Sequence, residues 1–167
     1  LVRSRGLGDV YKRQALLGEG RIVALKGLGG YLLACDASSP EVVLRLRDRK
    51  RRPSKPFAVM VRDIETARLH CDLTPEEEAL LSSAAAPIVL ARWRAASTVC
   101  AEVAPRLSFL GVMLPYTPLH HLLMREYARP LVMTSGNLTE EPIAAEEDEA
   151  LTRLRGIADY YVTHNRP

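Results

Sequence analysis

Short apolar runs alternate along this chain with segments that carry helix start signals, and this alternation constrains the fold more than any other feature. The apolar runs are rich in β-branched and aliphatic residues, which is typical of buried strands. The segments between them begin at capping residues or prolines, which is typical of helices. Together they predict an α/β fold in which helices flank a twisted, mixed and open sheet. Strands are predicted over residues 22–25, 31–35, 57–61, 88–90, 112–114, 131–133 and 160–162, and helices over 38–51, 63–69, 74–82, 118–127 and 146–155.

Two of the predicted helices begin with the spacing of a capping box. Thr74 and Glu77 have this spacing, and so do Ser38 and Glu41. In this motif each side chain bonds a backbone N–H group of the first turn that has no partner within the helix. Residues 94–105 show no apolar period, and a loop is predicted there.

The length and composition fit one globular domain. The chain has 167 residues, of which 47% are hydrophobic and 26% charged, and its formal net charge is +3. A chain of this length can bury a substantial core, and the small net charge excludes a polycation. No apolar run approaches the length of a membrane span, so we expect a cytoplasmic protein that does not associate with membranes.

The cysteines and the N-terminal segment limit the possible metal sites and the extent of the domain. Cys35, Cys71 and Cys100 match no zinc-binding or CxxC spacing, so we expect reduced thiols and no metal site. Residues 1–14 resemble translated adapter sequence, and we interpret them as a non-native or disordered leader. The domain is then predicted over residues 15–167.

A dense cluster of positive charge marks the end of the first long predicted helix. Most charge runs are solvated helix faces, and the helix dipole accounts for one or two cations at this end. The remaining charge, and the stiff exit that Pro53 and Pro56 provide, favour an anion site. We interpret Lys50, Arg52 and Lys55 as candidate phosphate-binding residues, because fixed cations cost less to order around a ligand. The cluster consists of Arg45, Arg47, Arg49, Lys50, Arg51, Arg52 and Lys55, opposed by Asp48.

A compact set of small polar residues follows the apolar run over 131–133. Residues 134–137 read Thr-Ser-Gly-Asn. A strand end followed by an ordinary turn explains this segment on its own. Ligand sites in open α/β sheets lie beyond the carboxyl ends of strands, however, so Ser135 and Asn137 are candidate phosphate-binding residues.

The glycine-rich segment Gly27-Leu28-Gly29-Gly30 is interpreted as a tight turn between two strands. A dinucleotide fingerprint would require a helix after it, and a P-loop would require a following Gly-Lys-Ser/Thr. Neither pattern is present.

Two adjacent histidines, His120 and His121, lie on the helix predicted over 118–127. Adjacent helical residues point about 100° apart, so they make a poor pair of metal ligands. We expect one of them to be buried and hydrogen-bonded.

These segments together resemble a known family. Lys50-Arg51-Arg52 fits the K-x-R element, and Ser135-Gly136-Asn137 the S-x-N element, of the YrdC-like superfamily. Within it, the chain resembles the HypF carbamoyltransferase branch, since the related threonylcarbamoyl-adenylate synthases usually have S-A-N and often an arginine at position 113. The similarity extends over four ordered blocks, residues 26–37, 49–58, 110–120 and 133–138.

The resemblance implies a YrdC-like fold and an ATP-dependent reaction. ATP with Mg²⁺ would activate carbamate, delivered from carbamoyl phosphate, to carbamoyl adenylate with release of pyrophosphate. The carbamoyl group would then pass to the C-terminal cysteine of the partner protein HypE, for the cyanide ligand of nickel–iron hydrogenase. HypF proteins are much longer than this chain and resemble several joined domains, of which this is one.

The resemblance also implies roles for individual residues. Lys50 and Arg52 would be the catalytic cations, and they would bind the triphosphate together with Lys55. Ser135 and Asn137 would orient the phosphates or a magnesium shell, and Gly29, Gly30 and Tyr31 would border a small acid pocket. These roles require that the basic segment and the Ser135–Asn137 corner face one shared cavity.

Two alternatives remain open at this point. One is threonylcarbamoyl-adenylate synthesis for tRNA modification. The other is a binding module for double-stranded RNA, because the resemblance to the superfamily implies a concave basic surface. Contacts to phosphate backbones would then depend strongly on salt.

Overall fold

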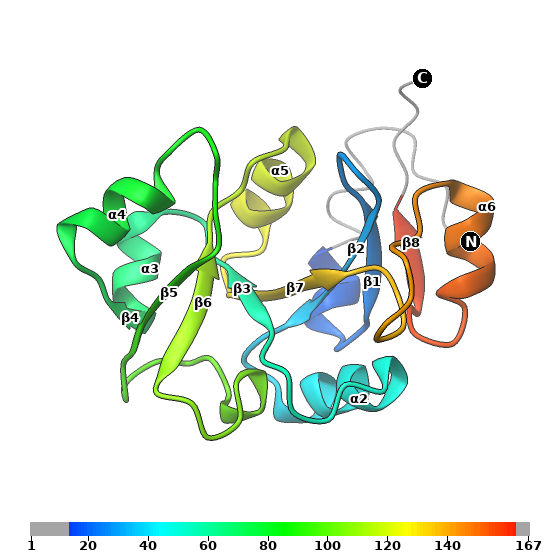
Figure 1. Cartoon of the computed structure of the whole chain (residues 1–167), viewed down its shortest axis with the longest axis horizontal. Coiled ribbons are helices and arrows are strands. Elements are labelled where there is room, and N and C mark those ends of the chain that lie inside the picture. The colour runs from blue at the N-terminus through cyan, green and yellow to red at the C-terminus, as the bar shows by residue number, and fades with distance from the viewer. Residues whose placement is uncertain (1–13, 163–167) are drawn as a thin grey trace.

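Strands from both halves of the chain meet in one mixed sheet in the computed structural model, which describes residues 14–162 (Figure 1). The strands within this range are β1 (Val23–Lys26), β2 (Tyr31–Asp36), β3 (Ala58–Met60), β4 (Cys71–Asp72), β5 (Val89–Trp93), β6 (Phe109–Met113), β7 (Leu131–Ser135) and β8 (Tyr160–Val162). Their order across the sheet is β4-β5-β6-β3-β7-β2-β1-β8. β3 runs parallel to β6, and β1 runs parallel to β8. β7 runs antiparallel to both of its neighbours, β2 and β3. The leader expected over residues 1–14 lies, except for residue 14, outside the described residues.

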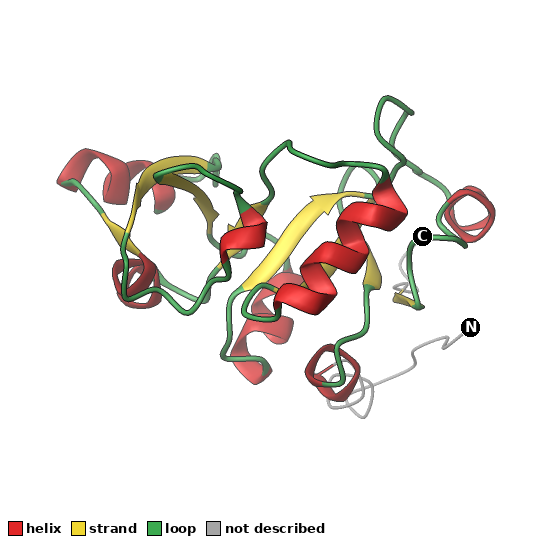
Figure 2. Ribbon diagram, turned by 90° about the horizontal axis from the view of Figure 1, so that it is seen from below, coloured by secondary structure: helices red, strands yellow, loops and turns green. Residues whose placement is uncertain are grey.

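Helices cover both faces of the sheet. Successive strand residues point to opposite sides, so the strands present apolar side chains on both faces, and each face needs a cover. They are α2 (Pro40–Lys50), α3 (Ile64–His70), α4 (Pro75–Leu81), α5 (Pro118–Glu126) and α6 (Glu147–Arg153), with a 3₁₀ turn, η1 (Ala101–Val103). One core contains Leu33 and Val132 and includes buried residues of α2, α3, α4 and α6. The other contains Ala34 and Met133 and includes buried residues of α5. Figure 2 shows α2 lying across the strands from below. The α/β fold with a mixed open sheet is therefore confirmed.

One of the two expected capping boxes is present. Thr74 accepts a bond from the backbone N–H of Glu77, whose side chain accepts one from the N–H of Thr74. The second expectation is wrong, because Ser38 Oγ donates to Asp36 at 2.5 Å and α2 begins one residue later, after Ser39. The Asp36 carboxylate is almost buried, so it binds the nearby hydroxyl that would otherwise have capped the helix.

Several predicted boundaries shift. β5 and β6 are longer than expected and pair from Val89–Val112 to Arg92–Phe109. Gly111 interrupts the apolar sequence from Phe109 to Leu114, and the predicted strand covered only the part after this glycine. The short strand β4 and the turn η1 were not predicted, since two or three residues are too few to show a period. α6 ends at Arg153, before Gly156.

The cysteines are free thiols as expected, with Cys35 and Cys71 buried and Cys100 partly buried. Over the described part of the chain, none of the helices has both the length and the apolar composition needed to span a bilayer.

Candidate active site

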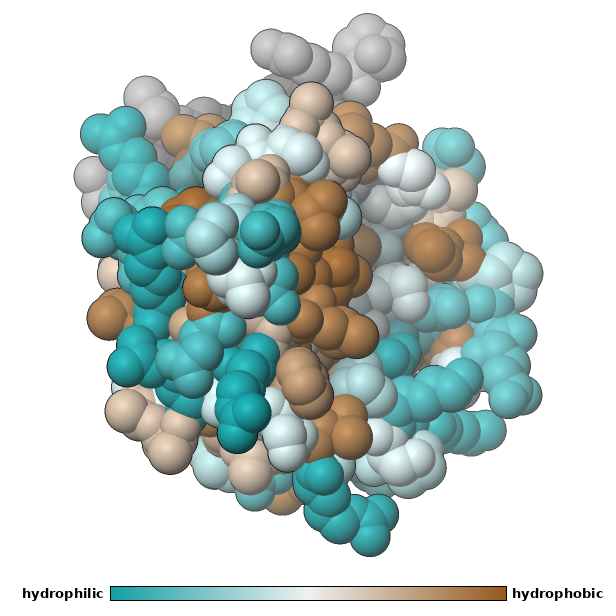
Figure 3. Space-filling model, turned by 60° about the vertical axis from the view of Figure 1, so that its left-hand side comes forward, coloured by the Kyte–Doolittle hydropathy of each residue, from teal (hydrophilic) through white to brown (hydrophobic). Residues whose placement is uncertain are grey.

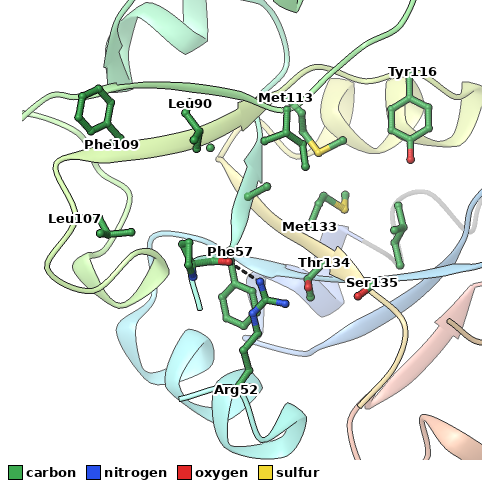
Figure 4. Close-up of a pocket in the computed structure, with 15 residues that line it drawn as sticks. Arg52, Phe57, Leu90, Leu107, Phe109, Met113, Tyr116, Met133, Thr134 and Ser135 are labelled. Atoms are coloured by element: carbon green, nitrogen blue, oxygen red, sulfur yellow. Dashed lines mark hydrogen bonds between the residues drawn. The ribbon is translucent and has the colours of Figure 1, made fainter. Parts of the chain in front are cut away.

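A cavity of about 860 Å³ opens where β5, β6, β3 and β7 lie side by side (Figure 4). Its walls are mostly apolar, and a band of hydrophobic side chains bordered by hydrophilic ones is visible on this side of the molecule in Figure 3. Arg52 is the one charged residue among the described residues that line it. The lining is formed by Leu32, Arg52, Pro56, Phe57, Ala58, Ile88, Leu90, Leu107, Phe109, Gly111, Met113, Tyr116, Met133, Thr134 and Ser135.

The hollow results from a row of small residues at the centre of the sheet. Gly111 of β6 and Met133 of β7 both pair with Ala58 of β3, and Leu90 of β5 pairs with Gly111. A glycine and an alanine side by side leave space between the longer side chains on either side. A Cβ at Gly111 would lie 3.1 Å from Ile88 Cγ2, so even the smallest side chain would crowd the cavity wall. A glycine within a strand often marks such a close approach.

The lower wall is formed by the segment that follows α2. Arg51 takes the left-handed conformation at the helix end (φ 52°), and the chain then turns so that Arg52 reaches the cavity beside Phe57 (Figure 4). The Arg52 guanidinium lies 5.1 Å from the centre of the Phe57 ring and donates to the carbonyl of Pro56 at 2.7 Å. These contacts hold one cation at the polar end of an apolar cavity.

Arg47 fixes this segment from behind. Its guanidinium is buried and donates to the carbonyl oxygens of Glu102, Arg52, Lys55 and Val103, at 2.7 Å for the first and 2.9 Å for the other three. It also lies 4.5 Å from the centre of the Phe57 ring. The second arginine of the basic cluster therefore binds backbone and leaves ligand contacts to Arg52.

The end of β7, with Thr134 and Ser135, forms the polar wall next to Arg52 (Figure 4). Lys50 is fully buried beneath it, and its ammonium group donates to the carbonyls of Ser135 and Asn137, both at 2.6 Å. Burial, and to a smaller extent the charge of Arg52, lower the pKa of Lys50 to about 8. The structure thus brings the basic segment and the Ser135–Asn137 corner together, with Lys50 in direct contact and Arg52 facing the shared cavity.

The corner is held close to the start of β2. The N–H of Gly136 donates to the carbonyl of Tyr31 at 2.7 Å, and a Cβ at Gly136 would lie 2.6 Å from that oxygen. Gly30 has a φ of +150°, and a Cβ there would lie 2.7 Å from Ile143 Cγ2. Gly30 and Tyr31 therefore support the loop after β7, and neither lines the cavity.

The other predicted site residues are placed less directly. Lys55 is exposed, and its carbonyl accepts bonds from Arg47 and Arg52. Gly29 is in the β1–β2 turn, as the interpretation of the glycine-rich segment expected, and it is absent from the cavity lining. Leu32, the second residue of β2, lines the cavity instead.

Sequence reasoning missed the apolar part of the cavity. Phe109, Leu90 and Met133 come from three strands, and only their pairing across the sheet brings them together. Gly111, within an apolar strand, was the one local signal of a close approach. The carboxyl end of β7 does not meet the carboxyl end of its neighbour β3. The two strands are antiparallel, so the end of β7 lies beside the start of β3.

His120 is buried, as expected of one of the two histidines, but the expected hydrogen bond is absent. Neither ring nitrogen has a partner among the described residues. The ring contacts Tyr116 edge-on, with 4.5 Å between ring centres, and Tyr116 lines the cavity. Burial, followed by the nearby His121, lowers the pKa of His120 to about 4.

This shift predicts an acid-dependent loss of stability. Between about pH 6.5 and the folded-state value, the unfolded chain takes up a proton at His120 and the folded protein does not, so the free energy of unfolding falls as the pH falls. We expect His120→Leu to remove about 2 kcal/mol of the stability difference between about pH 7 and about pH 5. Urea unfolding at both pH values measures it. The exposed neighbour variant His121→Gln should retain most of the wild-type difference, and an equal difference in His120→Leu would contradict the prediction.

The described residues contain no group of three or more histidine, cysteine, aspartate or glutamate side chains that could hold a metal ion. The oxygen of the Asn137 side chain accepts bonds from both Lys50 and Ser135, at 3.1 and 2.6 Å. Among the described residues, the cavity lining contains the cation of Arg52 and no carboxylate, which suits an anion.

The mixed open sheet and the cavity with one polar end define an α/β protein with a site for an anionic small molecule. Comparison with known sequences then identifies the family. The family model Sua5_yciO_yrdC, described as "Telomere recombination", matches residues 15–167. The chain belongs to this family.

Within the family, the chain is similar to HypF carbamoyltransferases. It is 50% identical to carbamoyltransferase HypF2 of Cupriavidus necator over 91% of this chain and 21% of that protein. A crystal structure of full-length HypF in a phosphate- and nucleotide-bound form superimposes with a TM-score of 0.91 and 48% identity, over 94% of this chain and 25% of the other. The chain thus spans about a fifth to a quarter of these relatives. A threonylcarbamoyl-AMP synthase of Xanthomonas campestris is 31% identical over 90% of this chain and 85% of that protein.

Proposed function

We propose that this domain uses ATP to activate carbamate, as part of a carbamoyltransferase of the HypF type. A carbamate oxygen attacks the α-phosphorus of ATP, the bond to the bridging oxygen breaks, and pyrophosphate leaves as carbamoyl adenylate forms. Carbamate itself comes from hydrolysis of carbamoyl phosphate to carbamate and phosphate. The later transfer to the C-terminal cysteine of HypE belongs to the longer protein and is part of the proposal.

The observation that carries this proposal is the division of the cavity into a polar end and an apolar wall. Arg52, Thr134 and Ser135 lie at one end, and Leu90 and Phe109 line the other side. A nucleotide has the same division, with an anionic tail and an aromatic base. The volume of the cavity, about 860 Å³, is within the usual range for small-molecule sites.

In this reaction the protein forms no covalent bond with the substrates. Positioning and charge neutralisation lower the barrier, because negative charge develops on the leaving pyrophosphate. Arg52 can engage two phosphate oxygens with its planar guanidinium group. The Ser135 hydroxyl, which donates to Asn137 Oδ1, would donate to a third only by rotating away from that bond. Lys55, exposed on the same segment, would contact the outer part of the tail.

Mg²⁺ would be held mainly by the phosphates in this proposal. The described residues contain no group of three or more histidine, cysteine, aspartate or glutamate side chains that could hold a metal ion, and the Asn137 oxygen is shared by Lys50 and Ser135. The ion would neutralise phosphate charge, which is its usual contribution to nucleotide chemistry. Ser135 would orient the phosphates that carry it.

Exchange of labelled pyrophosphate into ATP tests the proposal, with ammonium bicarbonate supplying carbamate by equilibrium. We expect exchange that depends on carbamate, and a loss of about 10²-fold or more in kcat/KM in Arg52→Met, because one charge-stabilising donor is removed. Arg51→Met, which alters the exposed neighbouring arginine, should retain at least half of the activity. Equal exchange in wild type and Arg52→Met would contradict the assignment of Arg52.

Threonylcarbamoyl-adenylate synthesis is the second candidate, and the similarity to a threonylcarbamoyl-AMP synthase favours retaining it. The identity to HypF relatives is higher, 50% against 31%. Adding threonine to the same assay separates the two. Exchange that requires threonine would support the second candidate and contradict the first.

Double-stranded RNA binding remains a prediction with less structural support. Arg47 and Lys50 are buried, and Arg49 forms an ion pair with Asp159 at 2.8 Å, so the basic cluster is not a continuous exposed stripe. A gel shift across a salt series tests it, since phosphate contacts weaken steeply with salt.

A further inference from the structure

All three N–H bonds of the Lys50 ammonium group have an acceptor within the protein. Nζ lies 2.6 Å from the carbonyl oxygen of Ser135, 2.6 Å from that of Asn137 and 3.1 Å from Asn137 Oδ1. A lysine ammonium has three donors and no acceptor. The side chain also has no exposed surface. In this arrangement no N–H of Lys50 is left to bind a ligand.

The backbone of Lys50 holds the other end of the same loop. Its carbonyl accepts bonds from the N–H of Thr139 at 3.3 Å and from Thr139 Oγ1 at 3.0 Å. Within the loop, Ser135 Oγ donates to Asn137 Oδ1 at 2.6 Å. One residue of α2 therefore fixes both ends of residues 135–139, including the hydroxyl group that faces the cavity.

We infer that Lys50 is a positioning residue, which orients the 135–139 loop around a bound anionic ligand and does not itself contact that ligand. This assignment differs from the one that the K-x-R resemblance implies, in which Lys50 binds the triphosphate. The contact of Lys50 with the loop exists without a ligand, and only its effect on ligand binding rests on the proposed function. Arg52, which lines the cavity, is then the direct phosphate contact of the pair.

Loss of affinity alone cannot separate these two roles. Within residues 14–162, no carboxylate lies within ion-pair distance of the Lys50 ammonium, so its charge attracts an anion in the cavity even without contact. A Lys50 variant should therefore bind anions less tightly in either case. The test must report on the loop and on the ammonium group themselves.

Hydrogen exchange in the ligand-free protein reports on the loop. We expect Lys50→Met to raise the exchange rate of the backbone amides over residues 135–141 by about tenfold or more. The backbone carbonyls of Ser135 and Asn137 and the side-chain oxygen of Asn137 would all lose their donor. Arg52→Met is the matched control, and its exchange over this segment should equal that of wild type. Equal exchange in Lys50→Met and wild type would overturn the inference.

NMR of the wild-type protein, labelled with ¹⁵N at lysine and arginine side chains, needs no variant and covers the case in which Lys50→Met fails to fold. We expect a Lys50 Nζ signal in slow exchange with water, in contrast to exposed Lys55, and a position that stays fixed when pyrophosphate is added while Arg52 Nε shifts. A Lys50 signal that exchanges like Lys55, or that shifts as much as Arg52, would overturn the inference. If pyrophosphate shifts neither group, the proposed function fails, and the exchange of the ligand-free protein still decides the role of Lys50.

Discussion

Gly136→Ala is expected to lose most of the proposed activity and about 2–3 kcal/mol of stability. A Cβ at this position would lie 2.6 Å from the carbonyl oxygen of Tyr31 and 2.9 Å from both its carbonyl carbon and its Cβ. The backbone oxygen cannot move away alone, because it accepts the N–H of Gly136 at 2.7 Å. Relief of the clash must therefore separate β2 from the loop that carries Ser135, and a shift of about 1 Å at a site can cost about 10²-fold in rate.

Pyrophosphate exchange and urea unfolding measure the two effects separately. Gly156→Ala is the matched control, because Gly156 is exposed and a Cβ there would meet no atom within 4 Å. It should change the free energy of unfolding by no more than about 0.5 kcal/mol. A Gly136→Ala protein as stable and active as wild type would show that the close approach to Tyr31 is absent in solution.

Arg47→Met is expected to destabilise the protein by about 3–5 kcal/mol, the largest effect on stability that we predict. The substitution leaves four carbonyl oxygens without the guanidinium donor, on η1 and on the segment that carries Arg52. The carbonyls of Glu102 and Arg52 then have no donor among the described residues, whereas those of Val103 and Lys55 keep the Phe57 N–H and Arg52 Nε. Each buried acceptor that loses its partner costs about 1 kcal/mol or more, and the lost contact with the Phe57 ring adds to this cost. Arg47→Lys should recover only part of the loss, because an ammonium group lacks the planar fork that reaches two segments at once.

The denaturant midpoint of each variant measures this difference. Arg62→Met provides the control, since Arg62 is about half exposed and pairs with its neighbour Asp63 at 2.9 Å. Exposed pairs of this kind contribute about 1 kcal/mol or less. If Arg47→Met unfolds at the same urea concentration as Arg62→Met, the buried bonds of Arg47 do not stabilise the fold as described.

The sequence predicted the elements better than their contacts. Apolar runs located all the longer strands, because a strand buried on one or both faces must be apolar wherever it packs. The Ser38–Glu41 capping box failed since the competing acceptor, Asp36, belongs to the preceding strand and its burial is a tertiary property. Local spacing holds no information about such a neighbour.

The candidate site shows the same limit. Spacing and charge indicated Arg52 and Ser135, and both face the cavity. The same signals could not show that Lys50 binds the loop backbone. The sequence around a lysine in a basic cluster is the same whether its side chain points into the protein or out to solvent. Its direction is set by the position of β7 relative to α2, which depends on strand order.

The last turn of α2 contacts both polar walls of the cavity through Arg47 and Lys50, which lie three residues apart on one side of the helix. Each helical residue adds about 100° of rotation. Adding or deleting a single residue within α2 would therefore swing both cations away from their carbonyls together and misalign the two walls at once. The number of residues in this helix is thus under a tighter constraint than the identity of those on its outer side.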